Sequence, residues 1–122
     1  MIVSFTGTRH GMSETQKDQF AFVISYFKSG TNAFHYGTHH DVNLLADREA
    51  ESIARAVGFT TKAHNAFRGE ELERNRELVA CGDILIAAPL SDEEVLRSGT
   101  WMTIRAARKA GKPVVMLSRG KA

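Results

Sequence analysis

The chain has 122 residues, of which 43% are hydrophobic and 25% are charged, and its formal net charge is +2. A chain of this length can bury a core without disulfides or metals, so a single domain over residues 1–122 is expected. The small net charge excludes an electrostatic argument for nucleic-acid binding, and neither a nucleic-acid nor a membrane partner is expected. The lone cysteine, Cys81, fits a reducing compartment, which favours a cytoplasmic location.

Apolar and amphipathic segments alternate along the chain, beginning with a β-prone run at Ile2–Thr6. Ser13 and Gln16 have the spacing of a capping box, which predicts the start of a helix. The apolar positions of this helix are Phe20, Val23, Ile24 and Phe27, with Phe22 and Tyr26 as a second pair. Two interpretations of this wide apolar face are open: a helix set deeply into its own core, or a contact in a homodimer or higher homo-oligomer.

The middle of the chain predicts two further strands, each followed by a helix. The strands are expected at Ala33–Tyr36 and Phe59–Ala63, and the helices at about Asn43–Val57 and Glu70–Cys81. Small and branched residues form the buried stripe of the first of these helices: Ala46, Ala50, Ile53, Ala54 and Val57. The buried line of the second helix is expected at Leu72, Asn75 and Val79.

The last third of the chain predicts a strand at Asp83–Ala88, a helix at about Gly99–Ala110 and a strand at Pro113–Leu117. Gly111 and Pro113 supply the stop signals of that helix. Strict alternation of strands and helices predicts an α/β, three-layer, Rossmann-like fold, a five-stranded parallel sheet with helices on both faces.

Ligands of such sheets bind beyond the carboxyl ends of the strands. Three loops leave strand ends here, Gly7–Met12, Gly37–Val42 and Pro89–Ser98, and we expect them to share one pocket. The step Ser98-Gly99-Thr100 opens a helix, where free N–H groups and the helix dipole attract phosphate or carboxylate. These features predict a small-molecule ligand of nucleotide type.

Four short motifs resemble those of the SLOG superfamily, small Rossmann-like domains related to cytokinin-activating phosphoribohydrolases and DNA-processing Smf proteins. The motifs are Gly7-Thr8-Arg9, the Gly37…Asp41…Leu45-Ala46 segment, Arg74-Asn75, and Ser98-Gly99-Thr100. The resemblance implies strand order 3-2-1-4-5 and a pocket for a nucleotide or nucleotide-derived ligand.

Two functions follow from this resemblance. In the phosphoribohydrolase branch a glutamate lies three positions after the threonine of the Gly-Thr step, whereas this chain has Thr103 there. Because threonine cannot replace a catalytic carboxylate, the first hypothesis is binding without turnover, as a sensor or carrier. The alternative is a nucleotide N-glycosidase or phosphoribohydrolase that uses a relocated carboxylate, Glu93 or Glu94.

The candidate ligand-binding residues are Gly7, Thr8, Arg9, Gly37, Thr38, His39, Asp41, Arg74, Asn75, Pro89, Ser98, Gly99 and Thr100. For Gly99 and Thr100 the alternative is a plain helix start capped by Ser98, and for Thr8 and Arg9 a solvated turn. Arg74 either reaches the ligand or pairs with an acid on the preceding helix. Asp41 either suits the helix dipole or binds a ribose hydroxyl, and Asn75 is expected to have a structural role.

Histidines near the second strand raise the question of a metal. His35, His39, His40 and Asp41 are of ligating types, but His10 and His64 are scattered and His-x-x-x-His spacing is absent. We therefore expect neither a metal nor another cofactor, and expect His39 or His40 to line the pocket.

Overall fold

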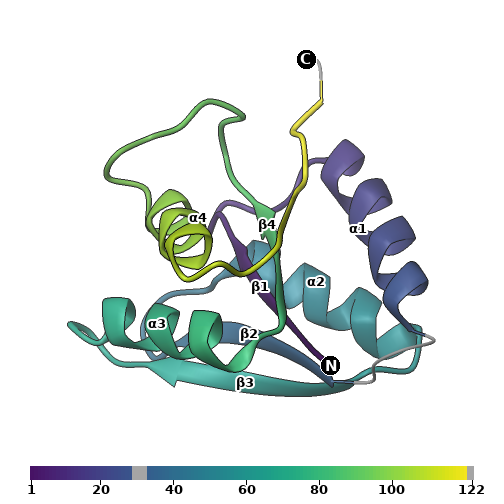
Figure 1. The fold of residues 1–122 in the computed structure, drawn as a ribbon, viewed down its shortest axis with the longest axis horizontal. Helices are drawn as coiled ribbons and strands as arrows, with labels where there is room; N and C mark the ends of the chain where they lie inside the picture. The colour runs from purple at the N-terminus through teal and green to yellow at the C-terminus, as the bar shows by residue number, and fades with distance from the viewer. Residues whose placement is uncertain (29–32, 121–122) are drawn as a thin grey trace.

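The computed structural model describes residues 1–28 and 33–120, which form one parallel sheet flanked by helices (Figure 1). The strands are β1 (Ile2–Gly7), β2 (Ala33–His39), β3 (Thr60–Ala66), β4 (Ile84–Ala88) and β5 (Val114–Met116). The helices are α1 (Glu14–Phe27), α2 (Leu45–Ala56), α3 (Glu71–Cys81) and α4 (Gly99–Lys109). The strand order is β3-β2-β1-β4-β5, which confirms the predicted α/β class and the order 3-2-1-4-5.

The helices α1 and α2 cover one face of the sheet, and α3 and α4 cover the other (Figure 1). Right-handed crossovers produce this division because the chain first moves outward from β1 to β3 and then returns to add β4 and β5. The strand order reverses between the neighbouring strands β1 and β4. Their carboxyl ends therefore mark the position where open α/β sheets bind ligands.

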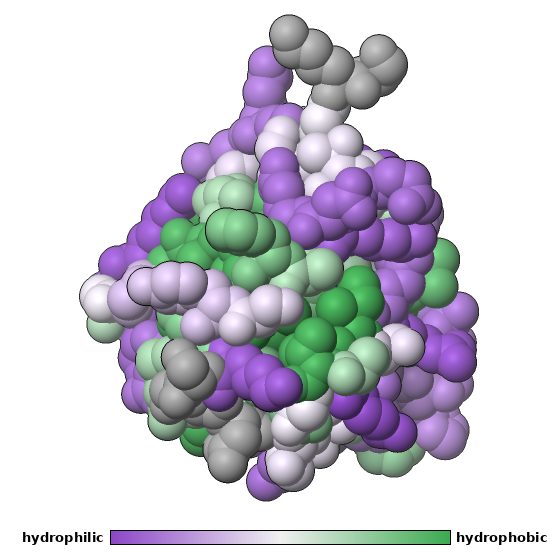
Figure 2. All heavy atoms as spheres, turned by 90° about the vertical axis from the view of Figure 1, so that its right-hand side faces the viewer, coloured by the Kyte–Doolittle hydropathy of each residue, from purple (hydrophilic) through white to green (hydrophobic). Residues whose placement is uncertain are grey.

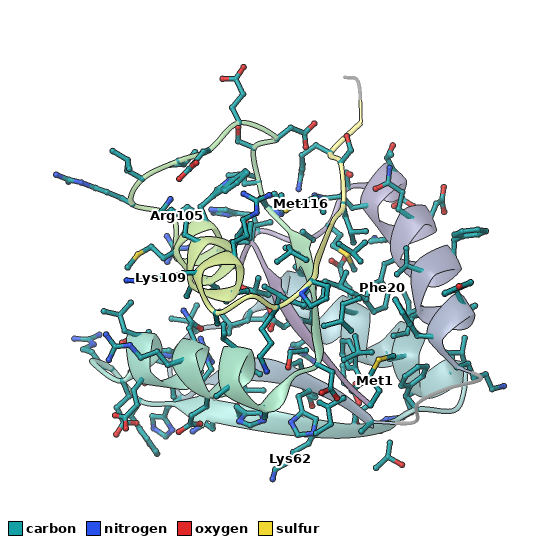
Figure 3. All side chains as sticks on the ribbon, in the orientation of Figure 1. Met1, Phe20, Lys62, Arg105, Lys109 and Met116 are labelled. Carbon is teal, nitrogen blue, oxygen red and sulfur yellow. The ribbon has the colours of Figure 1, made fainter. Side chains whose placement is uncertain are left out.

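The largest part of the core lies between the sheet and the α1–α2 layer. Phe20 points from α1 toward the sheet (Figure 3), and its ring meets Phe5 of β1 and Phe34 of β2 edge-on, at centroid distances of 5.6 and 5.8 Å. On the opposite face, smaller clusters form around Leu85 and Trp101. Every residue of β4 is buried, as the apolar composition of that strand predicts for a sheet covered on both sides.

The local signals at the helix ends are confirmed. Ser13 accepts from the backbone N–H of Gln16, and the Gln16 side chain accepts in return from the Ser13 N–H. Ser98 caps α4 by accepting from the N–H of Trp101. Gly58 and Gly111 follow α2 and α4 with φ angles of +102° and +75°, the left-handed conformation that ends helices.

Some predicted boundaries and faces are wrong. β2 and β3 each continue three residues beyond their predicted ends, because parallel pairing extends from Ala33 with Thr60 to His39 with Ala66. The predicted buried line of α3 is wrong at Leu72, which is 51% exposed, and confirmed at Val79, and the helix also buries Arg74 and Leu78.

The outer side of α1 carries the most exposed aromatic residues of the described chain. Phe22 is 78% exposed and Tyr26 is 74% exposed. Insertion of the helix into its own core therefore accounts for the buried side, with Phe20 and Ile24, but not for this pair. Figure 2 faces the side of the molecule where α1 lies and shows apolar residues gathered there between polar patches. No helix within residues 1–28 and 33–120 has the length and apolar character needed to cross a membrane.

Candidate functional site

A cavity of about 550 Å³ opens at the carboxyl edge of the sheet, beside the reversal of strand order. Its walls come from the loop after β1, the end of β2, the first turns of α2, α3 and α4, and the loop from β4 to α4. Nine of the candidate binding residues line it: Gly7, Thr8, Arg9, His39, Arg74, Asn75, Ser98, Gly99 and Thr100. Thus the β1 loop and the start of α4, distant in sequence, face one hollow.

The first turn of α4 forms the anion-attracting side of the cavity. Ser98 is engaged as the N-cap, with its hydroxyl accepting from the N–H of Trp101 at 3.2 Å. The N–H groups of Gly99 and Thr100 belong to the first turn of the helix and so have no intrahelical acceptor. Arg97, which also lines the cavity, adds a cation before this turn. Capping by Ser98 and binding of an anion by the following amides are therefore compatible.

The loop after β1 is a fixed turn. The Thr8 N–H donates to the carbonyl of Ala88 at 3.0 Å, and the Thr8 hydroxyl accepts from the N–H of His10 at 3.3 Å. The carbonyl of Arg9 accepts from the N–H of Leu45 at the start of α2. Thr8 is 8% exposed, whereas the Arg9 side chain is exposed. The backbone is thus held between β4 and α2, while the exposed side chain of Arg9 can meet a ligand.

A buried carboxylate, Asp47 in the first turn of α2, forms part of the cavity wall. It is 4% exposed and accepts from the backbone N–H of Gly37 at 2.9 Å. Burial raises the pKa of Asp47 to about 7, against the opposing effects of the Gly37 N–H and the positive charge of Arg74. A carboxyl group with this pKa changes charge near neutral pH at the wall of the cavity.

Arg74 is the buried cation of the site, 8% exposed, and its bonds are to protein groups. Its Nη1 donates to the carbonyls of Thr38 at 2.6 Å and His64 at 3.3 Å, and its Nε donates to Oδ1 of Asn75 at 2.9 Å. The sequence offered two interpretations of Arg74, contact with the ligand or pairing with an acid on α2. Asp47 is an acid on α2 whose charge interacts with that of Arg74. Asn75 orients this guanidinium, which fits its expected structural role, and both residues still line the cavity.

His39 at the end of β2 is held in one tautomer. Its Nδ1 accepts from the N–H of Asp41 at 3.0 Å, so Nε2 carries the proton and donates to Glu71 at 3.1 Å. Glu71 also accepts from the N–H of Gly69 at 2.7 Å. The pKa of Glu71 is lowered, first by its own backbone N–H and next by His39. This pair forms the polar wall of the cavity across from α4.

Other candidates lie outside this cavity. Gly37, Thr38 and Asp41 line a neighbouring hollow of about 360 Å³ that shares His39 with the cavity. Asp41 thus does not line one cavity with Thr8 and Thr100, although Val42 and Leu44, which follow it in the same loop, line both hollows.

Pro89 and the two proposed catalytic acids are also outside. Pro89 is buried, and its carbonyl accepts from the side-chain amide of Gln16 at 2.8 Å. Glu93 and Glu94 are exposed and do not line the cavity, and Glu94 forms an ion pair with Arg105 at 2.6 Å. Arg105 projects from α4 in Figure 3, on the side of the long loop. The carboxylates that line the cavity are instead Asp47 and Glu71.

Sequence reasoning passed over Asp47, although a signal was present. Positions 47, 50 and 54 follow helical spacing, so Asp47 lies on the same stripe as the buried alanines Ala50 and Ala54. An acid on a buried stripe needs partners and marks a site. Trp101, also outside the predicted set, is 5% exposed and lines the cavity. Its indole N–H donates to the carbonyl of Ser91 at 3.3 Å.

Comparison with known proteins shows the fold. No family model matches the chain, and no curated protein matches it in sequence. The molybdenum cofactor carrier protein of Chlamydomonas reinhardtii is similar in structure, with a TM-score of 0.67 and 19% identity over 94% of this chain and 75% of that one. The molybdenum cofactor binding protein of the phototrophic bacterium Rippkaea orientalis gives 0.67 and 18%, over 94% and 74%.

A second structure of the Chlamydomonas reinhardtii carrier protein has a TM-score of 0.58 and 18% identity, over 95% of this chain and 75% of that one. The similarity therefore extends over nearly the whole of this chain in all three cases. It establishes the Rossmann-like α/β fold independently of the sequence pattern.

Proposed function

We propose that this protein binds a small organic anion in the cavity at the carboxyl edge of the sheet and holds it as a carrier or sensor. The observation that carries the proposal is the meeting of two segments, Gly7–His10 and Ser98–Trp101, at one hollow. The first segment brings Arg9 to the hollow, and the second brings the amides of a helix N-terminus. Together these groups fit a phosphate or a comparable oxyanion.

The rest of the cavity suits a flat heterocycle attached to that anion. Leu90, Val95 and Trp101 supply apolar surface next to the anion side, while Asn75 and His39 supply polar groups. The volume of about 550 Å³ lies within the range of about 300–1,000 Å³ found for small-molecule sites. A nucleotide or nucleotide-derived molecule has this combination of an anionic end and a base.

The structural neighbours support the carrier interpretation. One is described as a molybdenum cofactor carrier protein and another as a molybdenum cofactor binding protein. We therefore place the molybdenum cofactor beside nucleotides as a candidate ligand. The groups that line the cavity suit an anionic small molecule of either kind. The two ligands are therefore tested separately.

The alternative, an N-glycosidase that uses Glu93 or Glu94, has less support in the geometry. Neither side chain lines the cavity, and Glu94 is paired with Arg105. Thr103 is also occupied, because its hydroxyl donates to the carbonyl of Gly99 at 2.9 Å. Binding without turnover therefore accounts better for the lining groups than hydrolysis does.

Isothermal titration calorimetry tests the proposal with nucleoside monophosphates and, separately, with the molybdenum cofactor. We expect one of these ligands to bind, and Arg9→Ala to weaken its binding at least about tenfold, because a charge-assisted hydrogen bond is lost. Arg68→Ala removes an exposed arginine outside the cavity and serves as the matched control.

The same samples test the enzymatic alternative. Chromatography after incubation with nucleoside monophosphates should show no free base. Release of base that is abolished by Glu93→Gln or Glu94→Gln would establish the glycosidase instead. Failure of every nucleotide and of the molybdenum cofactor to bind would contradict the proposed carrier function.

The exposed aromatic pair on α1 supports a further part of the proposal, self-association. Phe22 and Tyr26 are large, apolar and solvent-facing, which is unusual unless a partner covers them. We expect sedimentation velocity to show a dimer or larger homo-oligomer, and Phe22→Lys to shift it toward the monomer. A monomer at all concentrations of the unmodified chain would contradict this part.

A further inference from the structure

A second group of reactive side chains lies outside the cavity, at the other end of α3. His35 on β2, His64 on β3 and Cys81 at the end of α3 each direct one donor atom to a common point. Nδ1 of His35 lies 2.8 Å from Nε2 of His64, and Sγ of Cys81 lies 3.4 and 4.0 Å from these nitrogens. Three elements of the fold thus contribute one soft and two borderline donors.

The register of the sheet explains how this group forms. His35 pairs with Lys62 and Gly37 pairs with His64, so both histidines lie on the α3 face of neighbouring strands. α3 then runs antiparallel across that face and ends with Cys81 above them. Lys62 shares this register, but its exposed side chain extends away from the fold (Figure 3).

The spacing of the three donors matches a tetrahedral metal site. Bond lengths of about 2.0–2.1 Å to nitrogen and 2.3 Å to sulfur require about 3.3 Å between two nitrogens and about 3.6 Å between nitrogen and sulfur. The observed N–S separations of 3.4 and 4.0 Å lie on either side of their value, and the N–N separation of 2.8 Å is about 0.5 Å below its value. A separation of the two imidazoles by about half an ångström, with smaller shifts of the thiol, would therefore bring the three atoms to coordinating distance.

An outer carboxylate completes the pattern. Oε1 of Glu77 lies 3.5 Å from Nδ1 of His64, the ring nitrogen that does not face the other donors. In metal sites, ligating histidines commonly donate their second N–H to such a group, which fixes the tautomer and strengthens the ligand. Glu77 leaves Nε2 of His64 as the atom available to a metal.

From these contacts we propose that His35, His64 and Cys81 bind a zinc ion, with water at the fourth position. Two imidazoles and a thiolate suit a borderline-soft divalent ion, whereas calcium or magnesium would need oxygen ligands. The site would connect α3 to β2 and to the edge strand β3. It is separate from the anion cavity, whose lining includes Leu78 but none of the three ligands.

Cobalt(II) titration of the full, reduced and metal-free chain tests this site directly. Co²⁺ replaces Zn²⁺ in tetrahedral sites, and its bond to a thiolate gives a charge-transfer band in the near ultraviolet. We expect one Co²⁺ per chain with this band, displacement by one equivalent of Zn²⁺, and a higher unfolding midpoint with Zn²⁺. Absence of saturable binding, or binding without the thiolate band, would overturn the proposal.

Substitutions in the cluster distinguish metal coordination by the three side chains from simple packing of these side chains against one another. Cys81→Ser should abolish the charge-transfer band, and His64→Gln should weaken binding at least about tenfold. Glu77→Gln should weaken binding by about 10-fold while leaving the band in place. His40→Gln changes an exposed histidine outside the cluster and should titrate like the unmodified chain. Equal affinity in the Cys81→Ser variant and the unmodified chain would assign Co²⁺ to another place and overturn the site.

The metal-free variants need one check of folding. Each should show the circular dichroism spectrum and the unfolding midpoint of the metal-free unmodified chain to within a few degrees. If Cys81→Ser fails this check, His64→Gln and Glu77→Gln carry the comparison, because both keep the thiol. Retention of full affinity by both would overturn the proposal.

Discussion

The backbone N–H of Gly37 donates to the buried carboxyl of Asp47 at 2.9 Å, tying the end of β2 to the first turn of α2. This bond stabilises the ionised form, but burial of the carboxyl has the larger effect and raises its pKa from 3.8 to about 7. The folded state therefore binds more protons at Asp47 than the unfolded state between about pH 4 and pH 7.

The sign of this shift predicts a pH dependence of stability. The contribution of Asp47 to the free energy of unfolding should fall as pH rises from about 4 to 7, by on the order of a few kcal/mol, and then stay constant. Asp47→Asn should remove this fall and make the variant more stable than the unmodified chain at pH 8. Urea denaturation across this pH range measures it, with Asp18→Asn on the exposed side of α1 as control. Parallel curves for Asp47→Asn and the unmodified chain would disprove the assignment.

Gly37 is also required by the close approach of Arg74. A Cβ at position 37 would lie 2.8 Å from Nη1 of Arg74, and this guanidinium is held by the carbonyls of Thr38 and His64. Gly37→Ala should displace Arg74 and lower the free energy of unfolding by about 2–3 kcal/mol, because buried charge-assisted bonds are lost.

Gly99→Ala is the matched control for this change. A Cβ at Gly99 meets no atom within 4 Å, and Gly99 is not among the glycines with positive φ. Chemical denaturation should therefore show little or no loss of stability for Gly99→Ala. If Gly37→Ala lowers the free energy of unfolding no more than Gly99→Ala does, the position of Arg74 does not require a glycine at position 37.

How far the sequence predicts this molecule depends on whether a feature is local. The capping box of Ser13 and Gln16 spans four residues, so its signal is complete in the sequence, and it is confirmed. The alternation of strands and helices likewise determines the layers. The buried face of α3 was predicted only in part, at Val79, because the burial of Arg74 depends on the carbonyls of Thr38 and His64, which are distant in sequence.

The site was likewise predicted where its sequence signal is local and missed where it depends on contacts between distant segments. The Gly7–Arg9 loop and the Ser98–Thr100 step were found from their turn chemistry, and the structure places them at one cavity. The His35–His64 contact was out of reach because it depends on strand register, and the third strand was expected to end at Ala63. Asp41 was included as part of the Gly37…Asp41 motif, whereas the buried Asp47 lines the cavity.

Gln16 gives a test of a long-range connection that the capping signal did not predict. Its side-chain amide donates to the carbonyls of Pro89 at 2.8 Å and Leu117 at 3.3 Å, and the residue is fully buried. Gln16→Ala leaves these acceptors unsatisfied and should lower the free energy of unfolding by about 2–4 kcal/mol. Gln19→Ala removes a single, more exposed bond to Ser118 and should lower it by less than about 1 kcal/mol. Urea denaturation of the two variants checks the difference, and similar losses would contradict the buried connection.

The proposed function requires the β1 loop and the start of α4 to bind one anionic ligand together. Two-dimensional ¹⁵N–¹H correlation spectra, recorded during titration with nucleoside monophosphates and with the molybdenum cofactor, test it most directly. We expect the amide signals of Thr8, Arg9, Gly99 and Thr100 to shift together with one dissociation constant, while that of Phe22 stays in place. Shifts confined to a different surface, or no shift with any of these ligands, would contradict it.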